Sequence, residues 1–195
     1  MSQPTISPDE ALAKLMSGNR RYVSGTVVHP HQDAARRQEV LSGQQPFAIV
    51  LSCSDSRVPP EVFFDQGIGD IFIIRDAGNI VDDVVLGSIE YAAEHLGSPL
   101  MMVLGHDKCG AVAATVQGGE APGHIGSLIK AIAPAVEKAR AQSGDLLDKA
   151  IWQNIQDVAA AIQADALLAH LIHQGKLKVV GARYHLDTGA VELAP

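Results

Sequence analysis

The stretch Pro46-Phe47-Ala48-Ile49-Val50-Leu51-Ser52 runs without a charged residue directly into Cys53-Ser54-Asp55-Ser56-Arg57. A short, continuous apolar run of this kind is typical of a strand that is buried on both faces of a sheet. Similar runs, rich in residues that favour strands, recur at residues 71–74, 100–104 and 177–182. We therefore predict four strands, the first of which leads into a segment of polar and reactive side chains.

Helical patterns separate these strands. Apolar residues follow helical spacing over residues 84–96, and a stretch rich in Ala and Leu covers about 150–174. Strands that alternate with helices predict an α/β fold, in which a mainly parallel central sheet is flanked by helices.

Two helices are expected ahead of the first strand. Ser7 and Glu10 are spaced for a capping box, with Pro8 in the first turn, and the helix that they begin is expected to reach about residues 17–21. A second helix is expected at 33–41. We predict one domain over residues 1–195, with a helical arm at 1–45 and an α/β core at 46–195. Because these early helices have little sheet of their own to cover, we expect the arm to embrace a partner subunit.

Composition excludes several function classes. The net charge is −7, and the basic residues cluster no further than the pairs Arg20-Arg21 and Arg36-Arg37, so we expect no nucleic-acid partner and no anionic membrane surface. Residues 1–10 lack a basic-then-apolar signal pattern, and no apolar stretch approaches the roughly 20 residues of a membrane span. These features predict a cytoplasmic protein, where two cysteines are more often metal ligands than a disulfide.

Both cysteines of the chain lie in short motifs at the ends of predicted strands. Cys53 follows the first strand, and the run His106-Asp107-Lys108-Cys109 follows the third. In open α/β sheets, binding sites gather outside the carboxyl ends of the strands, so the two motifs are expected to meet. Two thiolates and an imidazole are ligands that zinc prefers, and three protein ligands leave a fourth position, as in catalytic zinc sites.

Packing alone is the alternative explanation for the two cysteines, since most free cysteines are small buried apolar residues. It requires both to fall by chance beside polar loops at strand ends. Cys109 is further expected at the start of a helix that begins at Gly110, where unpaired amides favour a thiolate.

Asp55 and Arg57 allow more than one interpretation. A carboxylate and an arginine two residues apart usually form a surface ion pair of little energetic worth. Beside a zinc ion, Asp55 has three possible roles: to bind the metal, to accept a hydrogen bond from metal-bound water, or to be held away by Arg57. These alternatives stay open at the level of sequence.

Four motifs together resemble those of the β-class carbonic anhydrases, and the resemblance covers about residues 47–191. They are Cys-Ser-Asp-Ser-Arg-Val-Pro (53–59), Arg-Asp-Ala-Gly-Asn (75–79), Gly-His-Asp-Lys-Cys-Gly-Ala (105–111) and Gly-Ala-Arg-Tyr-His-Leu-Asp-Thr-Gly (181–189). The resemblance implies Zn2+ bound by Cys53, His106 and Cys109. It also implies a zinc-bound hydroxide that attacks carbon dioxide to give bicarbonate and a proton.

The resemblance also implies roles for further residues. Asp55 would accept a hydrogen bond from the nucleophile, and Arg57 would hold Asp55 off the metal; in some members this aspartate instead closes the site as a fourth ligand. The backbone N–H of Gly110 would bind a substrate oxygen. Gln66 is the candidate for a substrate-binding glutamine in the loop before the second strand, a place that the spacing also allows for Gly67.

Some members of the family bind a regulatory bicarbonate through a Trp, an Arg and a Tyr. Arg75 and Tyr184 match that pattern, but Val50 stands at the Trp position, so this chain departs from it. As a separate hypothesis, His31 or His124 relays protons to buffer.

Two alternatives to carbon dioxide hydration remain. Hydrolysis of carbon disulfide or carbonyl sulfide would suit the same zinc centre, and a non-catalytic zinc module would keep Asp55 on the metal. The presence of Arg57 favours the enzyme, because a purely structural site has no use for it. The resemblance further implies a homodimer or homotetramer with its clefts at the subunit interface, where residues 64–66 would line the neighbour's cleft.

Overall fold

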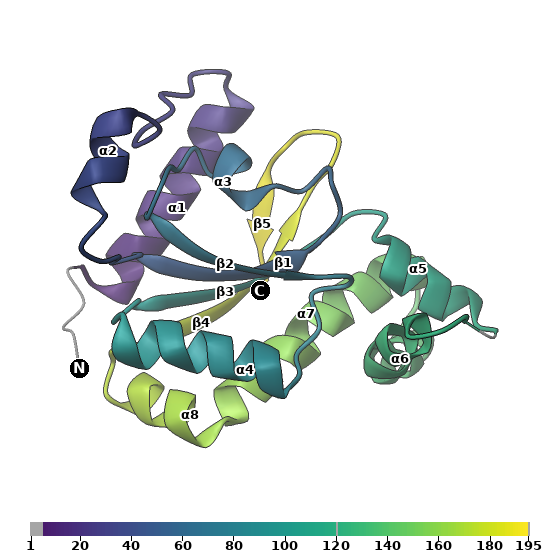
Figure 1. Cartoon of the computed structure of the whole chain (residues 1–195). Helices are drawn as coiled ribbons and strands as arrows, with labels where there is room; N and C mark the ends of the chain where they lie inside the picture. Colours follow the sequence, from purple (N-terminus) through teal and green to yellow (C-terminus); the bar gives the residue numbers. More distant parts are fainter. Residues whose placement is uncertain (1–5, 120, 195) are drawn as a thin grey trace.

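A five-stranded sheet forms the centre of the protein in this computed structural model, which describes residues 6–119 and 121–194 (Figure 1). Its strand order is β2-β1-β3-β4-β5. The strands are β1 (Ala48–Cys53), β2 (Ile71–Asp76), β3 (Leu100–His106), β4 (Lys178–Tyr184) and β5 (Val191–Leu193). The first four are parallel, and β5 pairs antiparallel with β4. The predicted α/β class with a mainly parallel sheet is confirmed.

The strand order reverses at β1. The chain passes from β1 to β2 on one side and then crosses to β3 on the other side of β1. Such a reversal opens a crevice at the carboxyl ends of β1 and β3, which lie side by side. Cys53 and His106 are the last residues of β1 and β3, rather than the first loop residues after them as predicted. The topology therefore places both motifs at this crevice.

Helices cover both faces of the sheet. In Figure 1, α1 (Pro8–Val23) and α3 (Pro60–Phe63) lie above it, whereas α4 (Asp83–Glu90), α7 (Leu146–Ala164) and α8 (Ala166–His173) lie below. The remaining elements are α2 (Ala34–Glu39), the π-helical turn η1 (Tyr91–His95), α5 (Gly110–Gln117) and α6 (Ile125–Arg140). Two apolar cores result, one on each side of the sheet.

The N-terminal helix packs on the sheet of its own chain. Ala11 and Leu15 of α1 are fully buried in the same core cluster as Val50 and Met102. The expectation that the early helices have little sheet of their own to cover is therefore wrong for α1, because its apolar stripe fits the upper face. In contrast, α2 buries none of its residues.

The predicted start of the first helix agrees with the structure better than its predicted end does. The backbone N–H of Glu10 donates to Ser7 Oγ at 3.3 Å and that of Ser7 donates to Glu10 Oε2 at 2.8 Å, so the capping box is confirmed. The helix continues to Val23, past the predicted end. The helix predicted at 33–41 is present as the shorter α2, and the one at 84–96 becomes α4 followed by η1.

The long helix predicted at 150–174 is broken in two. It begins earlier, at Leu146, and Asp165 interrupts it by accepting hydrogen bonds from the N–H groups of Leu167 and Leu168 as the cap of α8. Helix α6 was not predicted, because Pro134 in its interior hides the helical pattern. Strand β5 was also missed, being only three residues long.

Within the described residues, no single helix is long and apolar enough to cross a membrane. Helices α7 and α8 meet the length and composition requirement only together, as a pair bent by 84°.

Candidate metal centre

Three side chains from three elements converge at the crevice. Cys53 ends β1, His106 ends β3, and Cys109 is the residue that precedes the first turn of α5. All three are buried, and a ligand atom of each lies within 4.8 Å of the other two. The structure thus brings together the three predicted ligands as a group able to hold a metal ion.

The orientation of His106 suits a metal ligand. Its Nδ1 lies 2.8 Å from the backbone carbonyl oxygen of Asp107. Because a carbonyl only accepts hydrogen bonds, Nδ1 carries the proton and Nε2 keeps its lone pair. This Nε2 is buried and has no hydrogen-bond partner among the described residues. A buried orphan nitrogen beside two sulfurs is costly unless a cation binds it, so the group fits the implied zinc.

The pKa values of the two cysteine thiols are shifted in opposite directions. A hydrogen bond from the Cys109 thiol lowers the pKa of Cys53, and the N–H of Gly78 adds a hydrogen bond to Cys53 Sγ at 3.3 Å. The same sulfur contact, together with burial, raises the pKa of Cys109. A second thiolate therefore requires a positive charge in place of the shared proton. Two thiolates and one imidazole make up the soft donor set that suits zinc.

Asp55 lies at the edge of this group and is held by Arg57. The guanidinium donates from Nε to Oδ1 at 2.9 Å and from Nη2 to Oδ2 at 2.8 Å, and the backbone N–H of Arg57 also donates to Oδ1. These hydrogen bonds hold the pKa of the Asp55 carboxyl well below its usual range. Oδ2 lies 3.9 Å from His106 Nε2. In this geometry, Arg57 holds the Asp55 carboxylate beside the group formed by Cys53, His106 and Cys109.

Arg75 also holds the segment from Cys53 to Asp55. It donates from Nε to the carbonyl oxygen of Cys53 at 3.1 Å and from Nη2 to that of Asp55 at 2.7 Å. Tyr184 instead stacks on Phe63 with ring centroids 4.3 Å apart. The described contacts do not join Arg75 to Tyr184, and Val50 is fully buried in the upper core. The residues that matched the regulatory pattern thus have separate structural partners.

Gly110 begins α5 directly after Cys109. The first N–H groups of a helix lack partners within the helix. Gly110 is exposed, and none of the described hydrogen bonds uses its N–H as a donor. Its N–H is therefore available to a small anionic or polar group.

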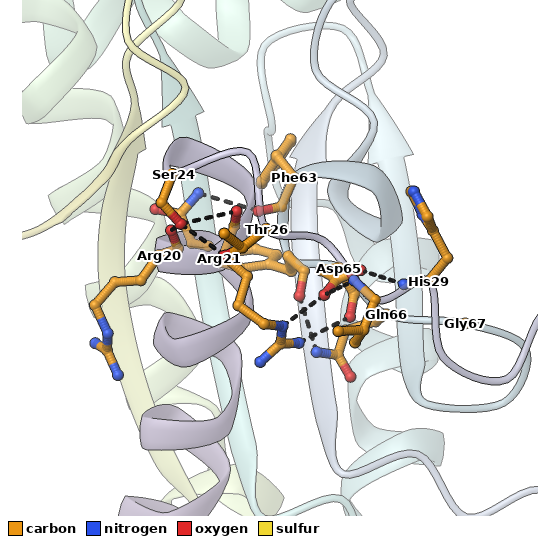
Figure 2. A network of polar contacts seen from close by, with 12 residues as sticks. Arg20, Arg21, Ser24, Thr26, His29, Phe63, Asp65, Gln66 and Gly67 are labelled. Carbon is orange, nitrogen blue, oxygen red and sulfur yellow. Dashed lines mark hydrogen bonds and ion pairs between the residues drawn. The ribbon is translucent and has the colours of Figure 1, made fainter.

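Gln66 is not brought to the metal group within this chain. Its Nε2 donates to the carbonyl oxygen of Phe64 at 2.8 Å, and the side chain is buried beside Gly18 of α1. Figure 2 shows it next to Asp65 and the Arg21 guanidinium. Its substrate role, like that of Gly67, remains a prediction that depends on a second copy of the chain.

The two histidines considered for proton relay lie elsewhere. His31 Nδ1 is 2.7 Å from one Asp70 oxygen and 2.9 Å from the other. His124 immediately precedes α6. Neither has a described contact with the metal group.

Two contributors to the site were missed at the level of sequence: the N–H of Gly78 and the carbonyl of Asp107. Both are backbone groups, which leave no side-chain signature. The one available signal is the glycine of Asp76-Ala77-Gly78, whose φ of +91° is a conformation that favours glycine.

Comparisons with known proteins agree with this geometry. A family model described as carbonic anhydrase matches residues 48–191. A carbonic anhydrase of Mycolicibacterium smegmatis is 40% identical over 97% of this chain and 95% of its own length. The chain belongs to the carbonic anhydrase family. Carbonic anhydrase 2 of Mycobacterium tuberculosis is 38% identical, over 97% of this chain and 94% of its own length.

Solved structures place the chain in the β-class of that family. A Coccomyxa β-carbonic anhydrase in complex with acetazolamide has a TM-score of 0.73 and 26% identity, over 93% of this chain and 85% of that chain. One of two β-carbonic anhydrases of Sordaria macrospora, described as tetrameric, shares the fold with a TM-score of 0.76 and 22% identity, over 94% of this chain and 96% of that chain.

Proposed function

We propose that this chain catalyses the reversible hydration of carbon dioxide to bicarbonate and a proton at a Zn2+ centre held by Cys53, His106 and Cys109. The observation that carries the proposal is a buried group of two sulfurs and an orphan imidazole nitrogen, with a carboxylate held beside it by an arginine. The family supports the reaction, and the chemistry of the donor set supports the metal.

The positions of the residues support the following roles. A zinc ion held by these three residues would supply Lewis acidity, which would lower the pKa of a bound water toward about 7. Asp55 accepts a hydrogen bond from the attacking water and orients its lone pair, while Arg57 keeps the carboxylate charged and turned away from the ligands. The N–H of Gly110 donates to the substrate oxygen on which negative charge develops.

We further propose that the chain acts as a single domain in the cytoplasm and assembles as a homodimer or homotetramer. The Sordaria macrospora protein with this fold is described as tetrameric. Four large apolar residues between residues 6 and 62 are exposed in the isolated chain: Val23, Val28, Leu41 and Val62. A partner that covers them would bring Gln66 toward its cleft.

The test is stopped-flow carbon dioxide hydration from about pH 6.5 to 9, a range that brackets the ionisation of a water on zinc. We expect about one zinc per chain and a measurable rate at neutral pH, because Arg57 holds Asp55 away from the ligands. A rate that appears only above about pH 8 would contradict this open arrangement. Protein that carries zinc without hydrating carbon dioxide would point to sulfur-containing substrates or to a non-catalytic module.

Two variants separate metal binding from chemistry. Cys53→Ser is expected to lose its zinc, whereas Ser54→Ala, on the exposed neighbour, keeps it. Asp55→Asn is expected to keep zinc but to lose about 100-fold in hydration rate, the lower range for a positioned acid-base group. Full zinc content in Cys53→Ser would remove Cys53 from the ligand set, and an unaltered rate in Asp55→Asn would remove Asp55 from the chemistry.

A further inference from the structure

Asp107, the residue between His106 and Lys108, is fastened to β4 and its following turn at several points. Arg183 donates to Asp107 Oδ1 from Nε at 2.6 Å and approaches it with Nη2 at 2.6 Å. On the other oxygen, the backbone N–H of Leu186 donates at 3.2 Å and His185 Nδ1 lies at 3.2 Å. The backbone N–H of Asp107 donates to the carbonyl oxygen of Tyr184 at 3.1 Å. Side chain and backbone of Asp107 are thus both held.

Arg183, which clamps the Asp107 carboxylate, is itself bound to a helix. Arg183 is 9% exposed, and its Nη1 donates to Asp148 Oδ1 in the first turn of α7. A planar guanidinium that binds two carboxylates keeps a fixed direction, which a flexible lysine would not. The position of Asp107 is therefore set jointly by β4 and α7.

Asp107 transmits this position to the metal group through its backbone. Its carbonyl oxygen is the acceptor for His106 Nδ1–H, the hydrogen bond that turns Nε2 toward the two sulfurs. The next residue, Lys108, has a φ of +52°, which a side-chain-bearing residue rarely adopts. Without the clamp, the peptide between Asp107 and Lys108 is free to relax out of this strained turn and to carry the carbonyl away from the imidazole.

We propose that Asp107 is a positioning residue for His106: its carboxylate, clamped by Arg183, holds the carbonyl that fixes the direction and the tautomer of the imidazole. The inference rests on the proposed function, since it takes His106 as a metal ligand. A stability role alone explains the cluster poorly, because a buried arginine with two carboxylates is often no more stable than an apolar replacement.

The neighbouring cavity does not require a separate ligand. It has a volume of about 290 Å³ and is lined in part by Lys108, Asp145 and Asp187. The buried charge beside it, Arg183, is already neutralised by Asp107 and Asp148. The charge of Arg183 is thus balanced by residues of the same chain. The contact of this cluster with the metal group is the hydrogen bond from His106 to the Asp107 carbonyl.

The experiment compares the zinc-loaded wild type with Asp107→Asn. Two readouts other than activity are used: the rate of zinc release to an excess chelator, and the visible spectrum of the Co2+-substituted protein. We expect about 10-fold faster release, as for the loss of other groups that orient a metal-binding histidine, and shifted ligand-field bands. Asp187→Asn is the matched control, because it removes the same charge from the same cavity, and the structure describes no side-chain hydrogen bond for Asp187.

Further variants keep the inference decidable. Arg183→Lys retains the positive charge but loses the planar guanidinium that binds both carboxylates, so it is expected to shift the cobalt spectrum in the same direction as Asp107→Asn. If Asp107→Asn does not fold, the spectrum of Arg183→Lys tests the positioning role in its place. Asp148→Asn loosens only the far end of Arg183 and is expected to have a smaller effect.

The outcomes separate this inference from the proposed function. Folded Asp107→Asn with wild-type zinc release and an unchanged cobalt spectrum would overturn the positioning role, even if its thermal stability falls. A wild type that binds no zinc, or a His106→Ala variant that keeps it, would overturn the metal centre itself and the inference with it.

Discussion

Gly78 shows how one residue supports the site without a functional side chain. Its N–H donates to Cys53 Sγ, its carbonyl oxygen accepts from Asn154 Nδ2 at 2.9 Å, and its φ is +91°. A Cβ at this position would lie 2.7 Å from Ile132 Cδ1 and 3.1 Å from Ala111 Cβ. The backbone conformation thus favours glycine here, and the close packing adds to that preference.

We predict that Gly78→Ala lowers the free energy of unfolding by about 2–4 kcal/mol, the sum of a left-handed backbone cost and of overpacking. Zinc affinity should fall as well, because the N–H moves away from Cys53. Urea unfolding of the metal-free protein and a zinc titration measure the two effects.

Gly175→Ala is the control for Gly78→Ala. Gly175 has a φ of +68°, but a Cβ there would meet no atom within 4 Å. It therefore carries the backbone cost without the clash and leaves Cys53 untouched. Equal losses in the two variants would show that the packing around Gly78 is not tight.

At the scale of elements, the side chain of Asp165 caps α8 at the break between α7 and α8. Asp165 Oδ1 accepts hydrogen bonds from the N–H groups of Leu167 and Leu168 at 3.0 and 2.9 Å. The turn that it makes lets Leu168 and Leu171 of α8 reach the lower core, which a straight continuation of α7 would not bring to the same place.

We predict that Asp165→Ala costs about 1 kcal/mol of unfolding free energy, the usual loss for a helix cap replaced by alanine. Asp165→Ser keeps an acceptor and should cost only a few tenths of that. Chemical denaturation of the two variants is the measurement. Identical stabilities would mean that packing, rather than the cap, sets the bend.

At the scale of the whole molecule, the buried carboxylate of Asp65 holds the chain in place between the end of α1 and the start of α2. Helix α2 buries no residue, so the apolar effect does little for it. In the stretch that precedes α2, Asp65 accepts from Arg21 Nε at 2.6 Å and from the N–H groups of Val28 and His29 at 3.1 and 2.9 Å. In Figure 2, the Arg21 side chain and the His29 backbone approach the Asp65 carboxylate from two sides.

We predict that Asp65→Ala lowers the free energy of unfolding by about 2–4 kcal/mol at neutral pH, because it leaves Arg21 and two backbone N–H groups without their acceptor. Burial raises the pKa of Asp65, but the hydrogen bonds from Arg21, Val28 and His29 outweigh it, so the pKa is lowered overall. The contribution of Asp65 is therefore present above its unfolded pKa of about 3.9 and is lost as the pH falls through the lower folded value.

The difference between wild type and Asp65→Ala should accordingly narrow below about pH 4. Denaturation curves at several pH values measure it, with Glu61→Ala, at an exposed position, as the control. A difference that stays constant down to acid pH would show that the ionised form of Asp65 contributes nothing.

Local sequence patterns were sufficient to predict much of the structure of this protein. The apolar run before Cys53, the capping box of Ser7 and Glu10, and the ligand spacing of His106 and Cys109 each depend on residues within a few positions of one another. Such features follow from chain geometry and side-chain chemistry, so the sequence by itself determined the α/β class and the group of residues able to hold a metal ion.

Only the tertiary structure decided how those residues are held. Arg183 and Asp107 are 76 positions apart, and so are Gly78 and Asn154; the packing of α1 on its own sheet likewise joins distant segments. Even for Asp55, whose partner is two residues away, only the tertiary structure showed that both carboxylate oxygens accept hydrogen bonds from Arg57. Long-range contacts depend on how the sheet and helices assemble around both cores, and no local periodicity encodes that arrangement.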